Sequence, residues 1–271
     1  MSDDKSARDA TPAGQPSAVT PRAGLRGGVV TGIVFAAIGA ALTWAVLQAC
    51  FPVFGLPEEF QRPLGTPPPE VKARLNVATA RMNRNNAIFA LGLFGATVAG
   101  LMGVGEGIAR RSLVAALLVG GLCAVVGAAV GSLAGLAGHL LWESNMSGSE
   151  SLPLEAAVLI HAVTLLLMGG GVGLAIGGVA GRSLRTSAAC LLAGMLAGAT
   201  AGVLYPFLGA VLAAYFGFQA NTDLVVPPGE VSRLFWIALP AVLLGLLIPG
   251  LKLGRTPRST QAAEPRGASP V

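Results

Sequence analysis

Charged side chains are scarce in this sequence, and their scarcity excludes most classes of soluble protein. Only 11% of the 271 residues are Asp, Glu, Lys or Arg, which is less than half of the roughly 25% found in soluble domains. Apolar residues make up 53% of the chain, and its mean hydropathy is +0.69. The composition therefore predicts an integral membrane protein.

Cysteine is also rare, and its placement excludes a disulfide framework or a zinc finger. Cys50, Cys123 and Cys190 lie in three separate apolar segments without a CxxC spacing. We expect all three to behave as small apolar side chains. The segment from Leu47 to Cys50 partly resembles a lipoprotein cleavage box, so lipidation of Cys50 is the alternative. The apolar run before it is as long as a full span, whereas a signal peptide has 7 to 15 apolar residues.

Catalytic motifs are missing as well. The sequence contains no HExxH motif, no Walker loop, and no Ser or Cys nucleophile motif with a paired base. The run Gly169-Gly-Gly-Val-Gly has the composition of a phosphate loop, but it follows an apolar helix rather than a strand. We therefore predict a protein that is not an enzyme and needs no cofactor.

Long uncharged segments are what the sequence has instead. Six of them approach or exceed the roughly 20 residues that a helix needs to cross a membrane. The prediction is an all-α polytopic bundle within residues 27–253, flanked by disordered cytoplasmic tails at 1–26 and 254–271. The expected spans are about 28–54, 86–108, 112–142, 155–181, 184–218 and 233–252.

The distribution of charge predicts the orientation of these spans. Six spans place both termini on one side, and that side carries 12 Lys or Arg against 5 acidic residues. The opposite side carries 6 against 8. Because positive residues mark the cytoplasmic side, we expect a multi-pass protein of an inner, cytoplasmic-type membrane with both termini inside. The net charge of +5 is then an orientation signal and does not indicate nucleic-acid binding.

Glycines at four-residue spacing form the most informative pattern. This spacing keeps small residues on one face of a helix and lets a second helix approach closely in lipid. A row of four such glycines in one span predicts a central helix packed between two related neighbours. The possible partners are then the lipid bilayer, a second copy of the chain, or another membrane protein. The predicted packing positions are Gly127, Gly131, Gly135, Gly169, Gly173, Gly177, Gly181, Gly194, Gly198 and Gly202.

Sequence similarity between different parts of the chain indicates duplicated hairpins. Shifting the chain by 71 residues gives 11 identities over positions 107–141, and the segments 68–75 and 227–234 also resemble each other. The pattern is compatible with three duplicated hairpins, each closed on the outer side by a loop with proline and acidic residues. Such symmetry occurs in transporters, and it also follows from duplication of any helical hairpin.

The second half of the first outer loop has a helical period. Val71, Leu75, Ala78 and Met82 recur at spacings of four, three and four. Two arrangements are open: an interfacial helix that touches lipid headgroups or a partner, and a polar extension of the second span that stands in solvent.

A weak metal signal lies at the outer boundary. His139 and Glu143 share a helical face, and the hairpin geometry places His161 on the neighbouring span. Together these three side chains could bind zinc, although interfacial histidines that bond to loops are the simpler interpretation.

Two functions remain open. The preferred one is a structural or assembly component built from glycine-packed helices. The alternative is a transporter or channel for small solutes or ions, which requires a central cavity lined by groups such as Ser132, Thr164, Thr200 and Tyr205.

Overall fold

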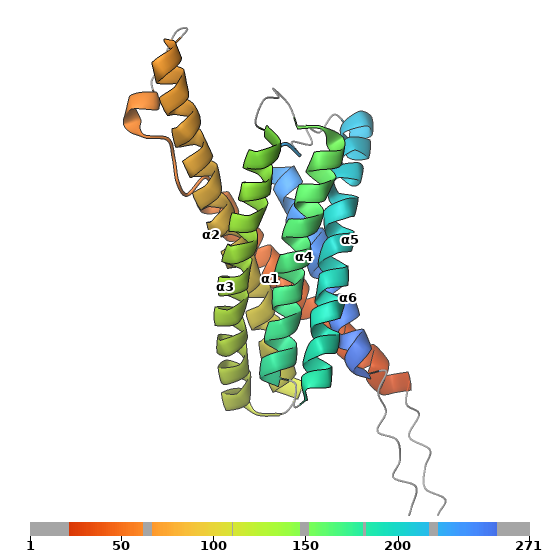
Figure 1. Cartoon of the computed structure of the whole chain (residues 1–271). Helices are drawn as coiled ribbons and strands as arrows, with labels where there is room; N and C mark the ends of the chain where they lie inside the picture. Colours follow the sequence, from red (N-terminus) through yellow and green to blue (C-terminus); the bar gives the residue numbers. More distant parts are fainter. Residues whose placement is uncertain are drawn as a thin grey trace, which may run out of the picture.

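The computed structural model describes residues 22–61, 67–109, 111–146, 152–180, 183–216 and 222–253. In these ranges all of the regular secondary structure is helical. Six helices are long and apolar enough to cross a membrane, which confirms the predicted polytopic bundle (Figure 1). The elements are α1 (Arg22–Cys50), the 3-10 turn η1 (Glu58–Phe60), α2 (Pro69–Ala109), α3 (Leu113–Met146), α4 (Leu154–Ala180), α5 (Leu184–Phe216) and α6 (Glu230–Leu253).

Several helix boundaries differ from the predicted spans. Helix α1 ends at Cys50 rather than near residue 54, because Pro52 cannot continue a helix and disfavours helical geometry in the residue before it. Helix α2 begins at Pro69 and runs without interruption into the second span. The segment with the helical period, residues 71–82, is thus the polar extension of α2. It projects beyond the other helices in Figure 1.

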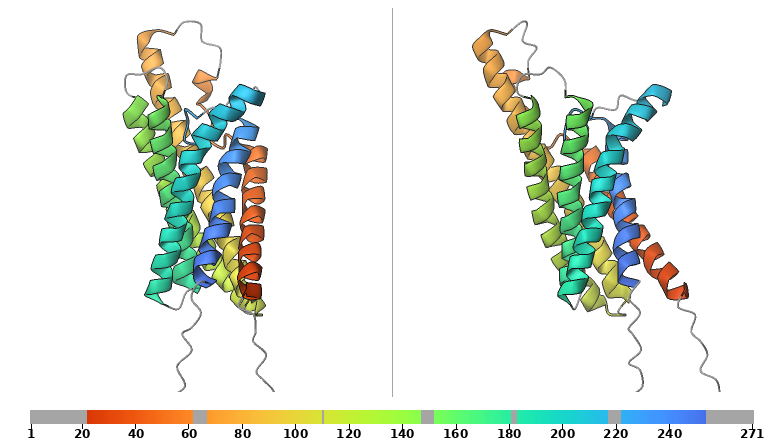
Figure 2. Two further views of the ribbon diagram at one scale, coloured as in Figure 1. Left: turned by 90° about the vertical axis from the view of Figure 1, so that its right-hand side faces the viewer. Right: turned by 45° about the vertical axis from the view of Figure 1, so that its right-hand side comes forward.

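The bundle has two different ends. The start of α1 and the end of α6 lie together at one end, which we call the terminal end, and the opposite end is the distal end (Figures 1 and 2). The α2–α3 and α4–α5 turns lie at the terminal end. The long α1–α2 and α5–α6 connections lie at the distal end, where the α2 extension also projects. Of the predicted disordered tails, 1–26 and 254–271, residues 1–21 and 254–271 fall outside the described residues, whereas residues 22–26 form the start of α1.

Only some of the closest helix pairs are hairpins of consecutive helices. The most extensive contacts join α2 with α3, α4 with α5, and α1 with α6. Helix α4 also contacts α2, α3 and α6, and together with α2 it is the most buried helix of the bundle. The first and last helices are thus neighbours, and their contact closes the bundle around α4.

The glycine rows lie at the two closest helix contacts. In α3, a Cβ added at Gly127, Gly131 or Gly135 would overlap the backbone of α2 at Gly95, Leu91 or Ala87. Helix α4 does contact both α3 and α5, but the glycine row of α3 meets α2 rather than α4.

The row of α4 faces α5. A side chain at Gly169 would overlap the backbone of Gly194, a side chain at Gly194 would overlap that of Gly169, and Gly173 abuts the carbonyl of Cys190. Gly177 lies against Ser187, Gly198 against Leu165, and Gly202 against His161 and Ala162. Gly181 lies outside the described residues. The described members of all three rows, in α3, α4 and α5, are occupied by contacts within one chain.

The last two helices contain internal prolines. Pro206 lies inside α5, and Pro240 and Pro249 lie inside α6. A proline removes one helical hydrogen bond and favours bending. In Figure 2 the distal part of α5 leans away from the neighbouring helices, so the two helices separate toward the distal end.

Candidate functional site

Buried polar side chains concentrate in the distal half of the bundle. Five of them come from four different helices and are at most 4% exposed, namely Asn86, His139, His161, Thr164 and Arg233. A sixth, Thr43, lies deeper and is satisfied by Thr97 and the Gly39 carbonyl. Polar groups are costly in an apolar interior unless they are hydrogen-bonded. The polar side chains of this distal layer are therefore the groups of the interior that are best placed to bind a ligand.

The α5–α6 connection covers this layer. Val225 and Val226, in the middle of the connection, are buried and point their apolar surface into the bundle end. The Trp142 indole donates a 2.6 Å hydrogen bond to the carbonyl of Asp223, and the His161 Nε2 lies 3.4 Å from the carbonyl of Thr222. Helices α3 and α4 thus hold the connection in place over the distal end.

A small cavity remains beneath the connection. Its volume is about 190 Å³, and its walls include Asn86, His139, Trp142, Val225 and Val226. The amide of Asn86 accepts a hydrogen bond from the Phe54 N–H at 3.0 Å and donates one to the Phe54 carbonyl at 2.9 Å. Asn86 therefore fixes the α1–α2 connection.

Several buried polar atoms have no partner within the described residues. They belong to α4, α5 and α6, and they are the His161 Nδ1, the Thr164 Oγ1, the Tyr205 hydroxyl, the Trp236 Nε1, and the Nε and Nη1 of Arg233. The rings of His161 and Tyr205 meet edge to face at 4.9 Å. Each unsatisfied buried group costs about 1–3 kcal/mol.

Arg233 is the most unusual residue of the layer. Its side chain is 4% exposed, its Nη2 donates to the Gln48 side chain at 3.0 Å, and its guanidinium lies 4.5 Å from the centre of the Phe51 ring. This cation contacts the end of α1 from the first turn of α6. It therefore joins the first and last helices where α1 ends.

Of the three residues of the predicted metal site, His139 and Glu143 lie close together, whereas His161 has other partners. His139 and Glu143 lie 3.9 Å apart, and the His139 ring stacks on Trp142. His161 instead contacts Thr222 and Tyr205. Among the residues that the structure describes, no group of three His, Cys, Asp or Glu side chains could hold a metal ion. Both histidines thus contact the distal connection or its anchor Trp142.

Comparison with protein-family models, curated proteins and solved structures found no match to this chain. Its function must therefore be argued from its own geometry.

A second cavity lies at the terminal end. It has a volume of about 400 Å³ and is lined by side chains of α1, α2, α4 and α6, among them Thr31, Phe35, Met102, Glu106 and Ile176. Glu106 is half-buried there; Arg110, its predicted ion-pair partner, lies outside the described residues.

The centre between the two cavities is filled mainly with apolar side chains, and the polar Thr43 and Thr97 there are hydrogen-bonded to each other. On α2 the cavity walls reach Asn86 from one end and Met102 from the other, and 16 residues of helix separate them by about 24 Å. Phe94 lies between and packs against Trp236, with ring centres 6.4 Å apart and both side chains fully buried. At mid-depth the described side chains of the bundle are therefore closely packed around Phe94 and Trp236.

The four residues expected to line a transport pathway lie in different places. Thr164 is buried against Gly138, Ser132 lines a shallow groove between α2 and α3, and Tyr205 lines a groove between α5 and α6. Thr200 is half-buried and is not among the residues that line the described cavities. None of the four cavities and grooves described here joins these four residues.

Sequence reasoning missed Arg233 and Asn86 as buried residues. Arg233 follows the third Pro- and acid-containing loop, where a charge is expected in solvent, and Asn86 sits among other asparagines at the predicted start of a span. Only the position of Arg233 inside the first turn of an apolar helix could have indicated burial.

Proposed function

We propose that this chain is a structural or assembly component of a membrane and not an enzyme. The observation that carries the proposal is the filled centre of the bundle, where Phe94 and Trp236 close the interior between the two end cavities. A protein that moves solutes requires a polar path at this depth, whereas a scaffold requires close packing. The excess of Lys and Arg at the terminal end supports an orientation in which that end faces the cytoplasm.

The α2 extension supports a role in assembly, because it offers a rigid surface beyond the bundle. Helix α2 has 41 residues and is about 60 Å long at 1.5 Å per residue, about twice the thickness of the hydrocarbon core. Val77 is 63% exposed on this extension, and Arg74 pairs with Glu59 at 3.0 Å, which holds η1 against it. A partner protein would contact this helix outside the bilayer.

Crosslinking in native membranes tests the proposal. A photoreactive p-benzoylphenylalanine at Val77 is expected to give one discrete protein adduct, and Arg81→Glu is expected to weaken that adduct because it reverses an exposed charge four residues away. The matched control places the same group at Leu117, which is 74% exposed on α3. Equal adducts from both positions, or none from Val77, would contradict a partner at the extension.

Transport is the second candidate, and the unpaired atoms of His161, Thr164 and Tyr205 are the observation that favours it. They provide a polar layer over the distal half of the bundle that a solute or water could use. Flux of a small solute into vesicles that contain only this chain, with its loss on Trp142→Ala, would replace the structural proposal with this one.

A further inference from the structure

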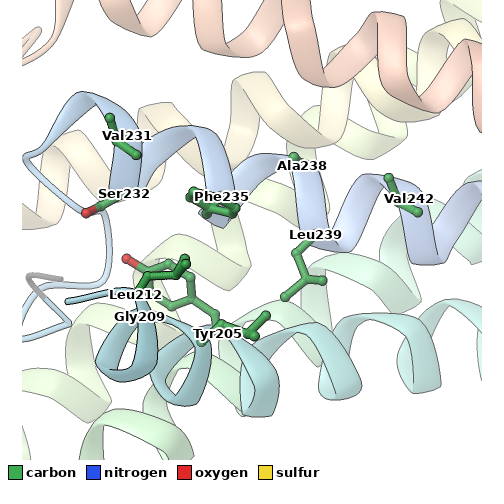
Figure 3. A pocket seen from close by; sticks show the side chains of 10 residues that line it. Tyr205, Gly209, Leu212, Val231, Ser232, Phe235, Ala238, Leu239 and Val242 are labelled. Atoms are coloured by element: carbon green, nitrogen blue, oxygen red, sulfur yellow. The ribbon is translucent and has the colours of Figure 1, made fainter. Parts of the chain in front are cut away.

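Two spaces between helices of the bundle differ in the charge of the side chains that line them. The groove between α5 and α6 is lined by Tyr205, Ala238 and Val242 among others, and none of its described lining residues is charged (Figure 3). The cavity at the terminal end instead has the carboxylate of Glu106 in its wall. A charge in an otherwise apolar wall restricts which ligands can bind, whereas an apolar wall alone does not.

The terminal cavity lies between the first and last helices and the two most buried ones. Its lining comes from α1, α2, α4 and α6, and its volume is about 400 Å³. Sites for small molecules have volumes of about 300–1,000 Å³ and are mostly apolar with a few polar groups. The described lining has two polar side chains, those of Thr31 and Glu106. The cavity therefore has the size and the composition of a small-molecule site.

The two polar side chains come from equivalent positions on the antiparallel helices α1 and α2. Thr31 is three residues from Gly28, the lining residue of α1 nearest the terminal end. Glu106 is three residues from Ala109, its counterpart on α2. Each polar residue is thus about 4–5 Å along its helix from the outer edge of the cavity. Polar groups at similar depth on two walls can hold the same end of one ligand.

The cavity is apolar below this polar layer. Phe35 and Met102 are each four residues further from the terminal end, which makes them about 6 Å deeper. Ile176 of α4 and Ile248 of α6 also line the cavity and are at most 2% exposed. A matching ligand therefore has a polar group toward the terminal end and a short apolar body.

The carboxylate of Glu106 favours a cation as the polar group. It already takes part in a contact within the chain, but its two oxygens have about four acceptor positions, so it can also accept from a ligand. An ammonium group forms the strong, charge-assisted kind of hydrogen bond with a carboxylate, whereas an anionic ligand would be repelled. An inorganic cation would exchange its water shell for mostly apolar walls, and such ions require several oxygen ligands.

We propose that the terminal cavity binds a small organic ammonium ion with an apolar chain. The ammonium group donates hydrogen bonds to the Glu106 carboxylate and the Thr31 hydroxyl. The apolar chain lies against Phe35, Met102 and Ile248. The site is at the opposite end of the bundle from the α2 extension, so this binding does not depend on a protein partner there.

Calorimetric titration with simple probes tests the charge and the chain separately. The full-length protein in phosphatidylcholine nanodiscs is titrated with n-butylammonium, and the heat measured with empty nanodiscs is subtracted. We expect one site per chain, with at least tenfold tighter binding of n-butylammonium than of uncharged n-butanol. Methylammonium is expected to bind at least tenfold more weakly than n-butylammonium, because it lacks the methylene groups that reach the apolar part of the cavity. Butyrate is expected not to bind.

Two matched variants test the role of the carboxylate. Glu106→Gln keeps the shape of the side chain and removes its charge, so it is expected to weaken n-butylammonium binding at least tenfold and to leave n-butanol binding unchanged. Glu70→Gln is the control, because it makes the same change in the exposed first turn of α2. Three results would overturn the proposal: unchanged affinity in Glu106→Gln, equal affinity of the parent protein for n-butylammonium and n-butanol, or no binding by the parent protein.

Photolabelling locates the ligand and does not require Glu106→Gln to fold. An n-butylammonium analogue with a diazirine in its chain is irradiated with the parent protein, and the labelled peptides are identified by mass spectrometry. Label is expected in residues 28–35 and 102–109, and excess n-butylammonium is expected to displace it. Label that concentrates in the α5–α6 groove, at residues 205–212 and 231–242, would show that the probe follows apolar surface alone, and the proposal would then be wrong.

Discussion

At the scale of single residues, the glycines of this bundle fall into two groups. In one group a neighbouring helix leaves no room for a side chain, and in the other that position is open space. Gly173 lies against the carbonyl of Cys190, where a Cβ would overlap backbone, whereas Gly178 has open space in the position of its missing side chain. Both are in α4 and are five residues apart. The pair therefore isolates helix contact from helix propensity.

We predict that Gly173→Ala lowers the free energy of unfolding by about 1–3 kcal/mol, because backbone cannot move aside as a flexible side chain can. Gly178→Ala is expected to change it by less than about 1 kcal/mol. Thermal midpoints in the same mild detergent, followed by circular dichroism, measure both. Equal midpoints for the two variants would show that the α4–α5 contact adapts to an added methyl group.

The Arg233–Gln48 hydrogen bond is the second residue-scale contact with a measurable consequence. Gln48→Leu removes the acceptor of a buried guanidinium, so we predict a loss of about 1–3 kcal/mol of stability. In an Arg233→Met background the same Gln48→Leu change is expected to cost close to nothing, since the cation that required the acceptor is gone. A double-mutant cycle measures the difference, and simple additivity would contradict the coupling.

At the scale of elements, the α5–α6 connection is held by few contacts relative to the apolar surface it covers. Trp142 provides the shortest of these contacts, with its indole nitrogen 2.6 Å from the Asp223 carbonyl. The aromatic body of Trp142 also stacks on His139. Removal of the indole N–H alone therefore affects the tether while leaving an aromatic ring in place.

Trp142→Phe is predicted to increase amide hydrogen exchange in residues 222–229 about two- to tenfold, which corresponds to one lost hydrogen bond. Exchange in the centre of α4 is expected to stay unchanged and serves as the internal control. If exchange in the connection is unaffected, burial of Val225 and Val226 holds the segment without the tether.

The sequence predicted some elements and missed others for definable reasons. Long apolar runs gave all six spans, because helix length and hydropathy are local properties. The partner of each helix is not local. The glycines of α3 have the same spacing as those of α4, yet Gly127 meets Gly95 of α2, and Gly95 belongs to no row of four-residue spacing that the sequence reading singled out. The groove at Ala238 depends on the bend after Pro206, whose direction the sequence does not specify.

At the scale of the whole molecule, the three cysteines form a built-in probe of topology. Cys50 is exposed at the distal end of α1, whereas Cys123 and Cys190 are buried within the bundle. Their different exposure means that one thiol per chain should react in the folded state.

A membrane-impermeant maleimide added to intact cells is predicted to label Cys50 alone, because the charge distribution places the distal end outside the cytoplasm. Cys50→Ser is the control and should abolish labelling. Labelling only after the cells are opened would reverse the orientation. A chain with a covalent lipid at Cys50 would fail to react under both conditions and would show the added mass.

The contact between α1 and α6 has a consequence for how the protein is made. Gly32 of α1 and Gly245 of α6 meet with backbone against backbone, but more than 200 residues of synthesis separate them. During translation α1 enters the membrane first and has only α2 as an early partner. Its second partner becomes available when the final helix leaves the ribosome. A chain that stops before α6 therefore leaves the Gly32 face of α1 uncovered in the bilayer, where quality-control proteases can distinguish it from a finished one.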